Sequence, residues 1–245
     1  MEWIDGASPR LRARLAGLVY LLFFLTSVVG AIVAPAVSEL GGVSGDAGAT
    51  AKYIITHEAS VRVAIALGLV STACYVALMA LFYQLFRPVS RTFALLALVF
   101  GLVGSAITGF GSLFQVAPLV VLKGDTYLSI FDARQLQALA LLFLNLNVQL
   151  GSIALVFFGA FQLALGYLII RSTFLPRFLG VLIALAGLGW LVFLAPPLAN
   201  ALLTYLEVLG FAAEASLMLW LLVLGVNEQR WTEQAARNKY QSLAP

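Results

Sequence analysis

Between Arg134 and Arg171 the sequence contains no charged residue, and this long uncharged run limits the chain to very few folds. The polar side chains inside it are all neutral amides or hydroxyls. As one helix, the segment from Arg134 to Arg177 would extend over roughly 55 Å, well beyond the roughly 30 Å hydrocarbon core of a bilayer. We therefore expect this segment either to bend or to begin outside a membrane.

The composition of the whole chain indicates the same environment. Hydrophobic residues make up 62% of the 245 residues, charged residues make up 10%, and the mean hydropathy is +1.01. A soluble domain carries about 25% charged residues. The sequence therefore predicts an all-α fold, a polytopic transmembrane helical bundle in one domain (residues 15–226), with a basic lead (1–14) and a polar tail (227–245).

Six apolar runs are long enough to serve as membrane spans: residues 15–37, 61–86, 93–122, 149–170, 178–194 and 199–226. Residues 134–148 form either an extension of the fourth span or a separate seventh helix. The Gly109 to Pro118 section is the one hint of a broken helix, and we expect Pro196-Pro197 to end the fifth span. The first apolar run exceeds the about 7 to 15 residues of a signal peptide, so we interpret it as a span.

Polar stretches connect these runs. The first connection, residues 38–60, starts with a glycine-rich segment, after which Asp46 or Thr50 is expected to cap a short helix over residues 51–56. A tight turn at RPVSRT follows the second span, and Asp132 is expected to cap the helix that begins near Arg134. The tail is expected to contain a short helix with Trp231 at the membrane interface.

Basic residues give the orientation. With six spans and a cytoplasmic N-terminus, ten basic residues fall inside and only four, Lys52, Arg62, Lys123 and Arg134, fall outside. Cytoplasmic loops carry such an excess of Lys and Arg. We therefore expect a multi-pass protein of the plasma membrane with both termini in the cytoplasm.

Several functions are excluded by what the sequence lacks. His57 is the only histidine and Cys74 the only cysteine, so a multi-histidine metal or haem site and an intrachain disulfide are ruled out. The basic residues flank apolar spans, which argues against nucleic-acid binding. Since no recognised nucleophile, metal-binding or nucleotide-binding motif is present, we expect no catalytic residue, no metal and no cofactor, and we favour a function other than catalysis without excluding an enzyme.

Two glutamates are the acidic residues that lie deep in a predicted span. Glu207 and Glu214 are seven residues apart and share one face of the last span, roughly 10 Å apart. A carboxyl group in lipid has to face the bundle interior, pair with a cation or stay protonated. It then either relays a proton or cation or anchors a ligand amine, or it fixes packing by bonding a neighbouring helix or pairing with Arg62 or Arg134.

A group of amides is the second candidate for a binding site. We expect them to line a polar pocket that opens outward, with Glu207 at its floor, or else to form hydrogen bonds between helices. Its members are Gln115, Asn145, Asn147, Gln149 and Gln162.

Five segments resemble a family of bacterial integral membrane proteins known as domain of unknown function 4386. They are GDAGATAKYI (45–54), FRPVSRTFALLAL (86–98), LQALALLFLNLN (136–147), LVFFGAFQLALGYLIIRSTFLPRFLGVLIALAGLGWL (155–191) and AAEASLMLWLLVLGVNEQRW (212–231). The resemblance implies one multi-helical membrane domain with no assigned activity. It also implies an acidic position at Glu214, an Asp and a His near Asn145 and Asn147, and an Arg near Gly101, where this chain carries none of the last three.

Three functions remain open at this point. The first is binding or transport of a small molecule, lipid or proton through a polar pocket with Glu214 and Glu207 at its floor. The second is an accessory subunit that packs against a membrane-protein partner or a second copy. The third, an intramembrane hydrolase using Glu207 or His57, is the weakest because the sequence lacks metal ligands and a nucleophile motif.

Overall fold

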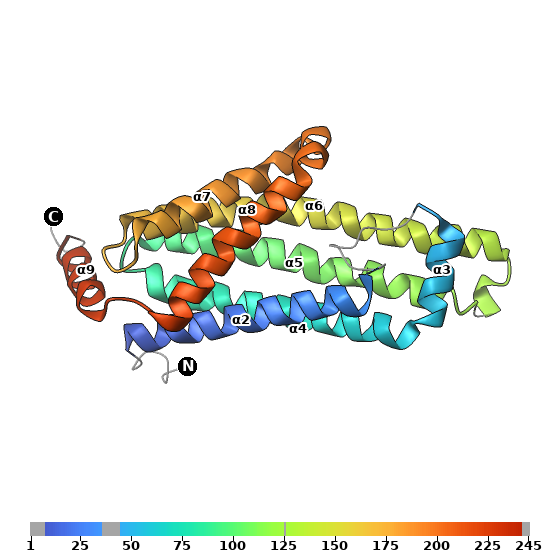
Figure 1. The fold of residues 1–245 in the computed structure, drawn as a ribbon, viewed down its shortest axis with the longest axis horizontal. Coiled ribbons are helices and arrows are strands. Elements are labelled where there is room, and N and C mark those ends of the chain that lie inside the picture. The colour runs from blue at the N-terminus through green and yellow to red at the C-terminus, as the bar shows by residue number, and fades with distance from the viewer. Residues whose placement is uncertain (1–7, 36–44, 125, 242–245) are drawn as a thin grey trace. The chain divides into compact units, whose positions relative to one another are not determined.

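The computed structural model describes residues 8–35, 45–124 and 126–241, and within these ranges the chain forms helices and no strands (Figure 1). Six of the helices in the described residues are long and apolar enough to cross a membrane. They are α2 (Pro9–Val33), α4 (Glu58–Phe86), α5 (Arg91–Val121), α6 (Ala133–Arg171), α7 with η3 (Arg177–Leu194) and α8 (Pro196–Val223). The remaining elements are α3 (Ala47–Thr56), η2 (Thr126–Leu128) and α9 (Glu228–Gln241). The prediction of an all-α bundle with six spans is confirmed.

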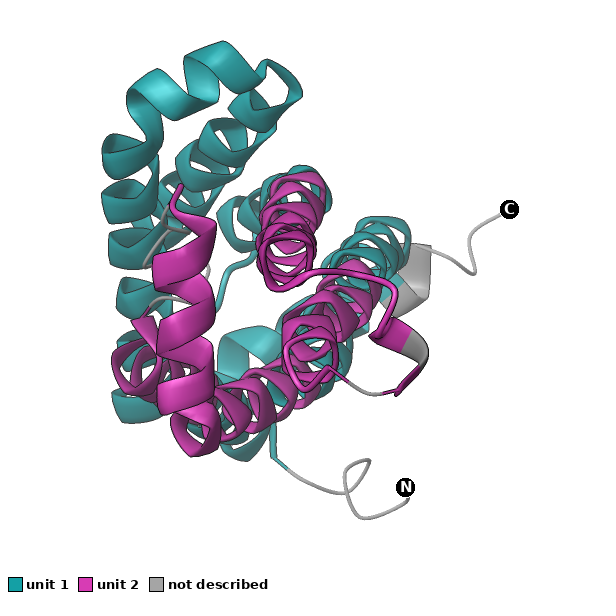
Figure 2. Cartoon of the chain, turned by 90° about the vertical axis from the view of Figure 1, so that its right-hand side faces the viewer, with its two compact units in different colours: residues 1–21, 74–104, 155–245 teal, residues 22–73, 105–154 magenta. Residues whose placement is uncertain are grey.

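The chain divides into two compact units, shown in different colours in Figure 2. Unit 1 comprises residues 1–21, 74–104 and 155–245, and unit 2 comprises residues 22–73 and 105–154. The helices α2, α4, α5 and α6 contribute residues to both units, whereas α7, α8 and α9 belong to unit 1. Each unit is described separately below.

The structure decides three expectations about helix boundaries. Residues 134–148 form the expected extension of the fourth span and not a separate seventh helix, because α6 runs unbroken over 39 residues and residues 133–150 contain no Gly or Pro. The helix α5 continues through Pro118, which lies in its last turn, so the suggested break is absent there. The fifth span ends at Leu194, before Pro196 and Pro197, as expected. These prolines then begin α8, three residues before the expected start of the sixth span, because a proline in the first turn of a helix loses no hydrogen bond within it. Residues 1–7, in the basic N-terminal segment, and residues 36–44, which include the start of the glycine-rich segment, lie outside the described residues.

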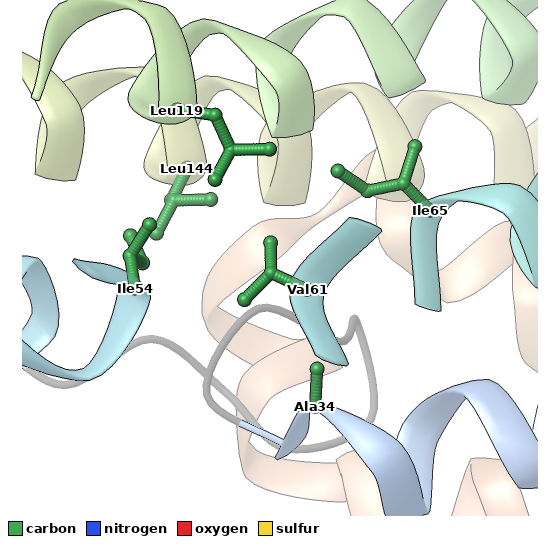
Figure 3. Packing of buried hydrophobic residues seen from close by; sticks show 6 residues of the cluster. All are labelled: Ala34, Ile54, Val61, Ile65, Leu119 and Leu144. Atoms are coloured by element: carbon green, nitrogen blue, oxygen red, sulfur yellow. The ribbon is translucent and has the colours of Figure 1, made fainter. Parts of the chain in front are cut away.

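In unit 2, aliphatic side chains from four helices and from Ala34 form a hydrophobic core (Figure 3). Its members are Ala34, Ile54, Val61, Ile65, Leu119 and Leu144. The two expected caps are confirmed. The side chain of Asp46 accepts hydrogen bonds from the N–H groups of Gly48 and Ala49 at the start of α3. Asp132 and Gln135 accept from each other's backbone N–H at 2.9 Å, a capping box that starts α6.

In unit 1, α6 and α7 pack backbone against backbone through two pairs of glycines. A Cβ atom at Gly159 would lie 2.8 Å from the carbonyl oxygen of Gly187, and one at Gly166 would lie 2.7 Å from that of Gly180. Seven residues separate the two glycines on each helix, which keeps them on one face. The two helices can therefore approach closely along this whole seam, as small residues allow in membrane bundles.

The tail helix α9 binds the ends of other unit 1 helices. The indole N–H of Trp231 donates to the carbonyl of Leu85 at 2.9 Å, and the Asn238 amide donates to the carbonyls of Pro88 and Val89. The Gln234 amide donates to the carbonyl of Arg171 at 3.3 Å. The last carbonyls of a helix have no partner within it. By supplying donors, α9 holds together the end of the bundle that includes the α4–α5 and α6–α7 turns, and the expected tail helix is confirmed.

We expect Gly166→Ala to lower the free energy of unfolding by about 1 to 3 kcal/mol, because the new methyl group would overlap backbone atoms of α7. The matched control is Gly68→Ala in α4, where a Cβ atom would meet nothing within 4 Å. That variant should be neutral or gain up to about 1 kcal/mol in helix propensity. Unfolding of both variants in detergent micelles measures the difference, and equal effects would show that the glycine seam is not tight.

The attachment of α9 should weaken in acid. Hydrogen bonds from the Ser8 hydroxyl and from the backbone N–H of Arg10, at 3.3 Å for the latter, hold the pKa of Glu228 below its usual value. Because the folded pKa is depressed, this contribution is complete above the unfolded value of about 4.3 and is lost as the pH falls through the folded pKa. The protection of the α9 amide hydrogens from exchange, relative to an unstructured peptide at the same pH, should therefore fall below about pH 4, and Glu228→Gln should remove this pH dependence.

Candidate functional site

Glu214 on α8 collects polar partners from other helices of unit 1. The amide Nε2 of Gln162, on α6, donates to its Oε1 at 2.5 Å. The hydroxyl of Tyr20, on α2, donates a second hydrogen bond to the same carboxyl group. Tyr75, on α4, lies close enough to interact electrostatically with both Glu214 and Tyr20. One carboxyl, one amide and two phenols thus converge from four helices.

All four groups lie at a similar depth from one end of unit 1. Gln162 and Glu214 each lie nine residues from the ends of α6 and α8, and Tyr20 and Tyr75 each lie eleven residues from the ends of α2 and α4. These intervals correspond to about 14 to 17 Å of helix. Since a hydrocarbon core is about 30 Å thick, the cluster lies near the middle of a bilayer whose surface coincides with these helix ends.

Aromatic rings surround the polar cluster. Tyr20 packs edge to face against Tyr75 and Phe82, with ring centroids 6.5 and 6.1 Å apart. Tyr75 packs in the same way against Phe158 and Phe161, at 5.2 and 6.0 Å. These are the distances of ordinary aromatic pairs in protein cores. The rings separate the polar groups from lipid and lower the dielectric constant around them.

The amide of Gln162 is the least satisfied group of the site. Its side chain is 1% exposed, and its Oε1 atom makes no hydrogen bond within the described residues. A buried polar atom without a partner costs about 1 to 3 kcal/mol. This oxygen is therefore available to accept a proton donor when one enters the site.

The carboxyl of Glu214 forms no ion pair within the described part of the chain. Of the two cations considered as partners from the sequence, Arg62 donates two hydrogen bonds to Glu58, at 2.9 and 2.7 Å, and Arg134 is exposed in the first turn of α6. The partners that Glu214 does have are neutral. The site can therefore compensate a charge on Glu214 only by hydrogen bonding, and otherwise holds it protonated.

Glu207 lies two turns before Glu214 on α8 and is partly buried. It makes no hydrogen bond or ion pair in the described ranges. The indole ring of Trp190 packs on Gly210, between the two glutamates. The structure thus separates the two acids, one hydrogen-bonded and one not.

The four other amides predicted to line a pocket all lie in unit 2, and their burial ranges from exposed to buried. Gln115 is partly buried, whereas Asn145 and Gln149 are exposed. Asn147 is 3% exposed, with its Oδ1 atom beside Gly111. The structure therefore brings Gln162 to Glu214 and leaves the remaining amides in the other unit.

Tyr20 and Tyr75 were not recognised from the sequence. Both stand in apolar runs, where an aromatic residue is typical of packing or of the membrane interface. One signal was available, because the hydroxyl of a tyrosine buried far from a span end needs a hydrogen-bond partner. Applied to Tyr20 and Tyr75, that rule would have marked both as polar residues of the interior.

The comparisons with known proteins give a family and no activity. A family model described as "Domain of unknown function (DUF4386)" matches residues 15–225. Neither the curated proteins nor the solved structures contain a match to this chain.

We expect Tyr20→Phe to lower the free energy of unfolding by about 0.6 to 1.7 kcal/mol, the range of hydrogen bonds between membrane helices. The variant keeps the ring and removes only the donor to Glu214. Tyr167→Phe is the control, because Tyr167 is 40% exposed and its hydroxyl makes no hydrogen bond within the described residues. Unfolding in micelles should separate the two variants, and equal stability would mean that the Tyr20 hydroxyl contributes nothing.

Proposed function

The chain belongs to the DUF4386 family, whose description assigns no activity, and we propose that it is a membrane protein that reversibly binds a proton at Glu214, as a proton-coupled carrier does. The observation that carries this proposal is the hydrogen-bonded carboxyl near the middle of a span, with neutral partners on three other helices. Carboxyl groups in such positions commonly mark proton relays and ion pathways in pumps and transporters.

The neighbours of Glu214 suit both of its protonation states. When Glu214 is charged, the Tyr20 hydroxyl and the Gln162 amide N–H donate to it. When Glu214 takes up a proton, its O–H becomes a donor and needs an acceptor. A half-turn of the terminal amide of Gln162 brings its unpartnered Oε1 to the carboxyl. Gln162 can therefore stabilise either state by turning.

The same features favour a proton over a larger ligand. The aromatic rings around Glu214 are in contact with one another, so a bulky ligand would have to displace them. A proton needs no additional volume. The excess of basic residues on one side of the expected topology supports cytoplasmic termini. The resemblance to bacterial integral membrane proteins supports the plasma membrane of a bacterium as its place of action.

Infrared difference spectroscopy across a pH titration of the purified protein tests the proposal. We expect a carboxylic C=O band that titrates, that disappears in Glu214→Gln and that persists in Glu233→Gln, a control on the surface helix α9. In Gln162→Met the band should move to higher wavenumber, because the C=O bond strengthens when it loses hydrogen bonds.

Glu214 would not be a proton-binding group if its carboxyl did not titrate. If no band titrates and Glu214→Gln is as stable as the wild type, Glu214 is a packing group. The accessory-subunit function would then be the better interpretation of the bundle.

A further inference from the structure

The helix α8 carries a line of side chains from its first turns to Glu214. Asn200, Thr204, Glu207, Phe211 and Glu214 follow one another at spacings of four and three residues, which keeps them within an arc of about 80°. We call these five residues the α8 stripe. Asn200, Thr204 and Phe211 are exposed, and Glu207 and Glu214 are partly buried. The stripe therefore follows the edge of the buried face of α8 from the start of the helix to Glu214.

Contacts with α7 show how deep the two glutamates lie. Phe178, near the start of α7, packs against Trp220, and Trp190, near the end of α7, packs on Gly210. Glu214 lies between these two levels, opposite the middle of α7. Glu207 lies one turn beyond Gly210 and is level with the end of α7. Glu207 is thus close to the end of the hairpin, about 10 Å of helix from Glu214.

The opposite direction is closed by apolar side chains. Beyond Glu214, the buried face of α8 continues with Leu217, Met218 and Leu221, which are 0%, 7% and 0% exposed. Phe82 and Leu165 are buried at corresponding depths on α4 and α6. The helix α9 then ties together the helix ends beyond this layer. The buried polar groups nearer that end include Arg12 and the Oε1 atom of Gln84. They lie eight and nine residues from Tyr20 and Tyr75 along α2 and α4, or about 12 to 14 Å of helix from the cluster.

Few other titratable groups face Glu214. The helices α2 and α4 contribute Tyr20 and Tyr75, and α8 contributes Glu207. The helix α6 contributes only the neutral Gln162, and α7 has no charged residue after Arg177. The helix α5 carries no charged residue after Arg91. Glu207 is therefore the acid that shares a face of α8 with Glu214, about 10 Å of helix from it.

We propose that protons reach Glu214 from the start of α8, along the α8 stripe and through Glu207, and not from the end that α9 closes. This inference rests on the proposed function, since it names the route to the same site. Glu207 takes a proton from water at the outer part of the stripe and returns to its charged form when it passes the proton to water along the stripe, which carries it over the remaining distance to Glu214. The two ends of this route are the partly buried Glu207 and the buried Oε1 of Gln162, neither of which has a partner among the described residues.

Thiol labelling tests whether water follows the stripe. Single cysteines are placed at Phe211, on the stripe, and at Ala212, one position around the helix, in a Cys74→Ser background. Both positions are exposed and differ little in depth. A charged, membrane-impermeant methanethiosulfonate should label F211C about tenfold or more faster than A212C, because it reacts with the thiolate, which forms in water. Equal rates, or no labelling of F211C in a folded variant, would overturn the route.

The kinetics of proton uptake test the role of Glu207. After a rapid pH drop, the Glu214 band should appear about tenfold or more slowly in Glu207→Gln, because proton transfer between positioned groups is lost. The equilibrium titration of the band should remain. Glu233→Gln should leave the rate unchanged, and an unchanged rate in Glu207→Gln would overturn the route. Failure of the route leaves a band that still titrates, whereas failure of the proposed function leaves no titrating band.

Discussion

The free-energy cost of an unpartnered polar group in hydrocarbon governs this fold. It requires every backbone N–H and C=O group in the membrane to bond within the chain, so the spans are helices throughout the described residues. The same cost applies to side chains. Glu214 lies near the middle of a span and is accompanied by an amide and two phenols from other helices. A carboxyl group at that depth needs hydrogen-bond partners inside the protein, and this cluster supplies them.

The backbone carbonyls at the helix ends of unit 1 also need hydrogen-bond partners, and they find them outside their own helices. The carbonyls that end α4 and α6 lack partners within their helices, and α9 supplies side-chain donors to them. The seam between α6 and α7 uses no polar group and relies on paired glycines that bring two backbones into contact. The hydrogen bonds from α9 at one end and the glycine contacts between α6 and α7 thus hold together the helices of unit 1 that surround Glu214.

Much of the architecture could be predicted from the sequence, because apolar runs between charged residues report directly on membrane spans. The boundaries of α6 and α8 could not, since a run of good helix formers and a proline pair are each compatible with a break or with a helix. Glu214 was identified because it is an acid deep in a span. Tyr20 and Tyr75 were missed, since a tyrosine in an apolar run gives no sign of which helix its hydroxyl faces. That partnership depends on packing between segments far apart in the sequence.

The hydrogen bonding of the Gln162 amide is the strongest argument that Glu214 alternates between a charged and a protonated state. A site that kept Glu214 charged at all times would gain from an amide with both of its polar ends satisfied. A purely structural hydrogen bond would gain in the same way, because an orphaned buried oxygen costs free energy. The amide here donates from one end and leaves the other unpartnered at 1% exposure. That arrangement is costly for a site with a single protonation state, and it is useful for one that alternates between accepting and donating a proton.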